Sequence, residues 1–114
     1  MNIVYKDKNL KRCSENAAYA LRQLGAEQTK CLLQRICAIK SAESFEDLRH
    51  LPGHFHELRH NRKGQWSFSL NGPYRLIVTQ LEHPIPLTSN GQFDWKAIRG
   101  AVIIEIVNYH KEGD

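Results

Sequence analysis

The chain has 114 residues, 41% hydrophobic and 25% charged, with a formal net charge of +4 at pH 7. This size and composition are typical of one globular domain, so we expect residues 1–114 to form a single domain. No apolar run approaches the roughly 20 residues of a membrane span, and residues 1–7 lack the apolar segment of a secretory signal. The sequence therefore excludes a membrane span, and we expect a cytoplasmic protein with no membrane partner.

The first half of the chain predicts one strand followed by helices. Residues 3–5 are β-prone and precede a polar turn. Ser14 is a candidate N-cap for a first helix, and Gly25 is well placed to end it. A second helix is expected over about residues 27–40. Its apolar face would hold Leu32, Leu33, Ile36, Cys37 and Ile39.

From residue 44 onward the signals change from helix to strand. Ser44 can cap a short helix that Pro52 and Gly53 end. Apolar and polar residues alternate strictly over residues 65–70, which is typical of a strand buried on one side. A turn signal at residues 71–73 and β-prone residues 74–79 complete an antiparallel hairpin.

The last third combines a loop with a final strand. Residues 82–100 carry two prolines and read as an inserted loop, in which Phe93 and Trp95 are expected to be pinned to the domain rather than exposed. Residues 101–107 are apolar enough to form a central strand.

Three cysteines, Cys13, Cys31 and Cys37, form no pair at the spacing of a metal or redox motif. We expect them to be reduced, small residues of the core or of a helix face. The pattern His54-Phe55-His56 has only the spacing of a strand, and no cluster of cysteines or carboxylates completes a metal site. We therefore expect no metal and no cofactor.

A basic segment precedes the hairpin. Residues 49–64 hold four cationic residues and four histidines, opposed only by Glu57, and this clustering suggests a surface that faces phosphate. A solvated basic loop is the simpler alternative. The candidate RNA-binding residues are Arg49, His60, Arg62 and Lys63.

Cleavage of RNA without a metal needs a base for the ribose 2′-hydroxyl, cations for the phosphate and an acid for the leaving 5′-oxygen. Histidine exchanges protons near neutral pH, and arginine grips phosphate oxygens. Tyr109 can stack on a base or donate a proton, although it could equally be a half-buried aromatic. The candidate catalytic residues are His56, Arg59, Arg75, Tyr109 and His110.

Residues 56–59 (His-Glu-Leu-Arg), residues 64–77 (beginning Gly-Gln-Trp-Ser) and the closing Tyr109-His110 resemble the HigB-like killer toxins of the RelE/ParE superfamily. The resemblance implies an α+β fold, in which two N-terminal helices pack on a small twisted antiparallel sheet. It also implies an endoribonuclease that cuts messenger RNA on the translating ribosome. The implied partner is a HigA-like helix-turn-helix antitoxin, through which alone the toxin would meet operator DNA.

One residue departs from that family. Many relatives carry a lysine where this chain has Arg59, and an arginine effectively cannot lose its proton. Arg59 is therefore expected to stabilise charge, which leaves proton abstraction to His56 or His110. Two alternatives stay open: a toxin of the gyrase-poisoning kind, and a basic RNA-binding domain without turnover.

Overall fold

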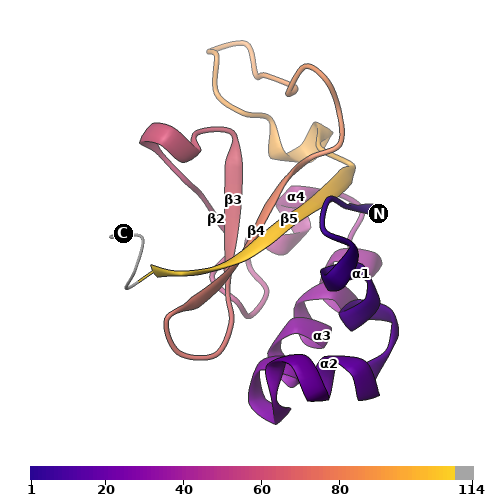
Figure 1. Ribbon diagram of the computed structural model, residues 1–114. Helices are drawn as coiled ribbons and strands as arrows, with labels where there is room; N and C mark the ends of the chain where they lie inside the picture. The colour runs from indigo at the N-terminus through magenta and orange to yellow at the C-terminus, as the bar shows by residue number, and fades with distance from the viewer. Residues whose placement is uncertain (110–114) are drawn as a thin grey trace.

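The computed structural model describes residues 1–109 and shows helices gathered beside a five-stranded sheet (Figure 1). A loop of residues 81–99 arches away from the sheet between its last two strands. The helices are α1 (Lys8–Glu15), α2 (Ala17–Leu24), α3 (Ala26–Ser41) and α4 (Phe45–Leu48), with short 3-10 turns η1 (His60–Arg62) and η2 (Trp95–Ala97). The strands are β1 (Asn2–Tyr5), β2 (His56–Glu57), β3 (Gln65–Ser69), β4 (Tyr74–Gln80) and β5 (Gly100–Asn108).

The strand order across the sheet is β1-β5-β4-β3-β2. The predicted hairpin and the predicted central strand are confirmed, since β3 pairs antiparallel with β4, and β5 lies between β1 and β4. The expectation of a purely antiparallel sheet is wrong at β1, which runs parallel to β5. The chain between these two strands contains the four helices and also β2 to β4, so it is long enough for the crossover that a parallel pair requires.

The predicted first helix is two helices that meet at Asn16. This residue ends α1, and its side chain accepts a hydrogen bond from the Tyr19 amide at the start of α2. Ser14 is not an N-cap, because it lies inside α1 with its hydroxyl bonded to the Leu10 carbonyl, and Asp7 caps this helix instead. Gly25 ends α2 at φ +80°, as its freedom from a Cβ allows.

Helix α3 confirms the predicted second helix, with Leu32, Ile36 and Ile39 buried along one side. The prediction for Cys37 is wrong, because this thiol is exposed, and Cys31 is only half-buried. Cys13 is fully buried. Burial raises the pKa of the Cys13 thiol, the Asp7 carboxylate adds to the rise and Arg12 opposes it, so the group that could attack as a thiolate stays protonated.

Residues of β3 and β4 alternate between two faces of the sheet. The core face carries Trp66 and Phe68 of β3 opposite Val78 and Leu76 of β4, and all four are fully buried. They pack under α4 in a cluster with edge-to-face aromatic contacts such as Phe45 on Trp66, with ring centroids 4.9 Å apart. The other face, here called the outer face, carries the alternate residues Gln65, Ser67 and Ser69 of β3 and Arg75, Ile77 and Thr79 of β4.

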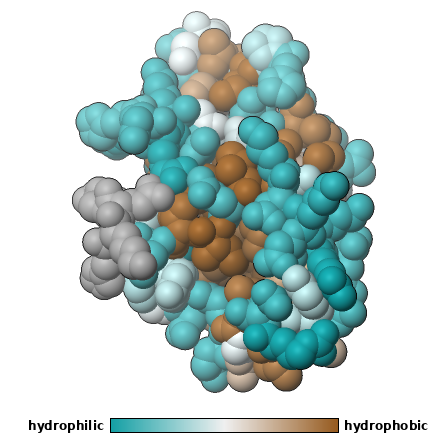
Figure 2. Space-filling model, in the orientation of Figure 1, coloured by the Kyte–Doolittle hydropathy of each residue, from teal (hydrophilic) through white to brown (hydrophobic). Residues whose placement is uncertain are grey.

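A β-bulge in β5 changes which of its residues face the core and which face the outer side of the sheet. Ile77 pairs with Glu105 and the next residue, Val78, pairs with Ile103, so Ile104 is left without a partner. The extra residue shifts the alternation, which places Ile103 in the core and Glu105 on the outer face. Hydrophobic atoms gather in the middle of Figure 2, over β5, where Val102 and Ile104 are only half-buried.

None of the helices within residues 1–109 is both long enough and apolar enough to cross a membrane.

Candidate active site on the outer face of the sheet

Strand register brings His56 and Arg75 to the same face. His56 lies opposite Ser67, Ser67 lies opposite Ile77, and Arg75 stands two residues along β4 from Ile77. Cross-strand partners project to one side of a sheet. From the spacings of strands and residues, we expect the Cα atoms of His56 and Arg75 to be about 12 Å apart. Both side chains project to this face, so a phosphate group bound between them could contact the imidazole from one side and the guanidinium from the other.

The imidazole of His56 is held in one orientation by its own chain. Its Nδ1 lies 2.8 Å from the carbonyl oxygen of His54. A carbonyl oxygen can only accept, so Nδ1 donates and Nε2 of the neutral ring keeps its lone pair. The ring also packs against the His54 ring, with centroids 4.5 Å apart and the two planes tilted by 37°. His56 is half-buried, and its Nε2 has the form that a general base needs.

Arg75 is braced by the hairpin turn and by an aromatic ring. Its Nη1 donates to the carbonyl oxygens of Gly72 and Tyr74 at 2.9 and 2.8 Å. Its guanidinium carbon lies 5.0 Å from the centre of the Tyr109 ring, a cation–π distance. The Tyr109 amide is bonded to the Pro73 carbonyl, which ties the end of β5 to the same turn. Within residues 1–109 no carboxylate pairs with Arg75.

The basic segment between β2 and β3 forms a tight turn at one edge of this face. Arg59 precedes η1 and is exposed, as are His60 and Lys63. His60 adopts φ +57°, which reverses the chain direction. Arg62 points across the outer face, where its guanidinium lies 2.9 Å from Gln65 Oε1 and 3.4 Å from Glu105 Oε2.

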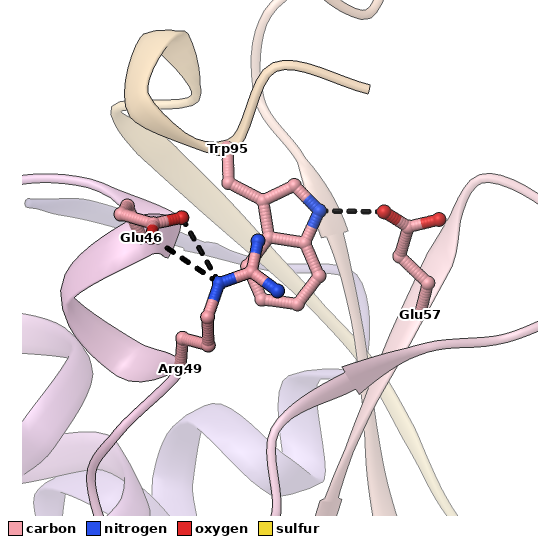
Figure 3. A network of polar contacts seen from close by, with 4 residues as sticks. All are labelled: Glu46, Arg49, Glu57 and Trp95. Atoms are coloured by element: carbon pink, nitrogen blue, oxygen red, sulfur yellow. Dashed lines mark hydrogen bonds and ion pairs between the residues drawn. The ribbon is translucent and has the colours of Figure 1, made fainter. Parts of the chain in front are cut away.

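Arg49 lies apart from these residues. Its guanidinium carbon is 3.7 Å from the centre of the Trp95 ring, and its Nε is 3.1 Å from a carboxylate oxygen of Glu46 (Figure 3). The Trp95 ring contacts Trp66 and Phe55 of the core, so Arg49 lies on the opposite side of β3 from His56. Its contact with RNA stays a prediction, and His110 lies outside the described residues.

The sequence pattern did not single out Ser67 or Glu105. Ser67 is fully buried on the outer face, and its hydroxyl has no hydrogen-bond partner within residues 1–109. Glu105 is drawn to this face by the bulge and is paired with Arg62. The parity of Ser67 with Gln65 was visible in the sequence, whereas no sequence signal marks a bulge.

Metal ligands are not assembled in the part of the chain that the structure describes. Residues 1–109 contain no group of three or more histidine, cysteine or acidic side chains placed to hold an ion. The groups of this region that could exchange a proton or bind an anion include His56, Arg59 and Arg75, while Arg62 is paired with Glu105.

Comparisons with known proteins agree with the fold. The chain resembles a YoeB/ParE toxin from Agrobacterium tumefaciens with a TM-score of 0.54 and 12% identity, over 93% of this chain and 95% of that one. It resembles a chain of the YoeB-YefM complex from Staphylococcus aureus with a TM-score of 0.54 and 15% identity, over 93% of each chain. No curated protein matches.

These likenesses and the α+β architecture define a RelE-like toxin fold. The family model described as the RelE-like toxin HigB of type II toxin-antitoxin systems matches residues 3–85, which is most of the chain. The protein belongs to this family of HigB-like toxins. The matched residues include His56, Arg59 and Arg75, and they end before Trp95 and Tyr109.

Proposed function

We propose that this toxin is a metal-independent endoribonuclease that cuts messenger RNA on the translating ribosome and so arrests translation. The observation that carries the proposal is the shared position of His56 and Arg75 on the outer face, with Arg75 stacked on Tyr109. A base, a phosphate-binding cation and an aromatic platform are the groups that such a reaction uses.

His56 acts as the general base in this proposal. Nε2 removes the proton from the ribose 2′-hydroxyl, and the 2′-oxygen attacks the adjacent phosphorus to form a 2′,3′-cyclic phosphate. The bond from phosphorus to the 5′-oxygen breaks, and an acid protonates that oxygen. Nδ1 stays bonded to the His54 carbonyl, which orients the ring throughout. His110 and Tyr109 are the proposed acids.

The cations stabilise the charge that grows on the phosphate. Arg75 offers donors that its two carbonyl contacts leave available, and its planar fork suits two phosphate oxygens. Arg59 is exposed at the edge of the same turn and is proposed to hold a neighbouring phosphate. The Tyr109 ring is proposed to stack on a base while it supports Arg75. Arg62, His60 and Lys63 extend the cationic edge, with Arg49 as a more distant RNA contact.

The proposed partner is a HigA-like helix-turn-helix antitoxin, which neutralises the toxin and links it to operator DNA. The family description, a toxin of type II toxin-antitoxin systems, supports an antitoxin partner. The structurally similar chain from S. aureus belongs to a YoeB-YefM complex, so a protein of this fold is found bound to a second protein, which also supports the proposal.

The test is brief expression of the toxin followed by mapping of new 5′ ends on messenger RNA, with Arg75→Ala as the paired sample. We expect growth arrest and cleavage within translated regions, both lost in the variant. Arrest accompanied by DNA damage and intact messenger RNA would instead indicate a gyrase poison. RNA binding without new 5′ ends would indicate a module without turnover.

A further inference from the structure

The loop of residues 81–99 is a folded structure with its own contacts. Leu87 and Phe93 form an isolated antiparallel bridge, and the Asp94 amide is bonded to the Pro86 carbonyl. The Arg99 amide donates to a carboxylate oxygen of Glu82 at 2.6 Å, which ties the two ends of the loop together. These contacts hold the loop in one conformation, so a residue of the loop can restrain the residues that it contacts.

Trp95 anchors this loop in the aromatic core. The side chain is 7% exposed and meets Phe55 and Trp66 edge to face, with centroids 5.6 and 6.0 Å away. Arg49 covers the ring from the α4 side, and Glu46 holds Arg49 in place. The indole nitrogen emerges on the opposite side, toward β2 (Figure 3).

The indole N–H of Trp95 donates to Glu57 Oε1 at 2.5 Å. Glu57 is the second residue of β2, directly after His56 and two residues before Arg59. Because side chains alternate along a strand, Glu57 projects toward Trp95 while His56 projects to the outer face. One hydrogen bond on the core side therefore links the loop to the strand that presents the proposed base.

Strand β2 needs such support. It has two residues, lies at the edge of the sheet and pairs only with β3 among the strands. The chain takes positive φ angles at His54 and His60, so it turns sharply on each side of β2. Short edge strands have little stability of their own and open readily.

We propose that Trp95 and Glu57 are positioning residues, through which the 81–99 loop holds His56 and Arg59 in register with Arg75. The inference rests on the proposed ribonuclease function, because its first test measures the rate of RNA cleavage. The loop would then support a proposed active site whose residues His56, Arg59 and Arg75 lie in an earlier part of the chain. Loss of the Trp95–Glu57 bond frees β2 to shift, and small displacements of a catalytic group are costly in rate.

The catalytic test compares cleavage of ribosome-bound messenger RNA by variants of the two partners. Trp95→Phe keeps the aromatic ring but removes the donor, and Glu57→Leu keeps the bulk but removes the acceptor. Both should lower kcat by about tenfold or more with a smaller change in KM. Glu57→Gln keeps an acceptor oxygen and should retain kcat within about twofold of the unchanged protein.

Trp66→Phe is the matched control. Among the described residues, the buried indole nitrogen of Trp66 has no hydrogen-bond partner, so this substitution removes the same atoms without breaking such a bond. It should lower the thermal unfolding temperature yet leave kcat largely intact. A kcat loss in Trp66→Phe equal to that in Trp95→Phe would overturn the proposal, because any loss of indole bulk would then suffice.

Hydrogen exchange at the Leu58 amide tests the positioning role independently of the proposed ribonuclease activity. That amide donates to the Gln65 carbonyl at 2.9 Å and reports on β2 pairing. Exchange should accelerate about tenfold in Trp95→Phe and Glu57→Leu, and remain slow in Glu57→Gln and Trp66→Phe. Unchanged exchange in the first two variants would overturn the positioning role. If the unchanged protein cleaves no RNA, the proposed function fails while this measurement still decides the positioning role.

Discussion

The two faces of strands β3 and β4 differ in their residues: one face packs into the hydrophobic core, and the other carries the polar groups of the proposed active site. On the core face, Trp66, Phe68 and Val78 are fully buried in one aromatic and aliphatic cluster. On the outer face, the strand register places His56 and Arg75 on the same side of the sheet as the buried Ser67. Burial on one side fixes the register, and register then dictates which polar groups meet on the other side.

The largest expected effect on the outer face comes from His56→Ala. Loss of a positioned general base should lower cleavage of ribosome-bound messenger RNA by about 10²–10⁴-fold, with the unfolding temperature nearly unchanged. Rapid-quench cleavage assays and a thermal melt measure the two quantities. His83→Ala, in the exposed loop, is the control and should keep full activity. Full activity in His56→Ala would assign the base elsewhere.

The core face should respond in stability. Phe68→Ala removes a fully buried ring next to Phe55 and should lower the free energy of unfolding by about 3–5 kcal/mol. Urea denaturation measures this loss. A change below about 1 kcal/mol would mean that Phe68 is not part of a close-packed core.

Arg75→Lys tests whether the fork of a guanidinium is needed. Lysine keeps the charge but cannot hold two phosphate oxygens in one plane, so cleavage should fall by about 10²-fold. The same rapid-quench assay applies, with the exposed Arg99→Lys in the loop as the matched exchange. Equal rates in Arg75→Lys and the unchanged protein would reduce Arg75 to a source of charge.

The smallest effect is expected at Ser67, one residue away from Phe68. In the part of the chain that the structure describes, the hydroxyl is buried without a hydrogen-bond partner, which costs stability. Ser67→Ala should therefore raise the free energy of unfolding by up to about 1 kcal/mol. A loss of stability in the same urea measurement would reveal a hydrogen bond to this hydroxyl in solution.

Much of the fold was predictable because its signals are periodic. The alternation of residues 65–70 gave β3, the turn at Asn71 and Gly72 gave the hairpin, and the apolar run at the end gave β5. The break at Asn16 was missed because one asparagine serves as the end of one helix and the cap of the next.

The parts of the site that sequence could not predict depend on distant partners. Two-residue β2 has no period to detect, and its place is decided by pairing with β3. The bulge at Ile104 follows from how β5 meets β4. The bond between Trp95 and Glu57 joins residues 38 positions apart. Arg49 lies in a basic segment and carries a guanidinium that could bind phosphate, yet in the structure it packs over the indole ring of Trp95.

The central claim is that His56 and Arg75 act together on one ribose phosphate, and a double-mutant cycle tests it most directly. Cleavage rates on ribosome-bound messenger RNA would be measured for His56→Ala, Arg75→Ala and the combined variant. Groups that work as a unit lose most of their effect with the first removal. We predict that the combined variant is within about tenfold of the slower single variant. A combined loss equal to the product of the two single losses would contradict the account.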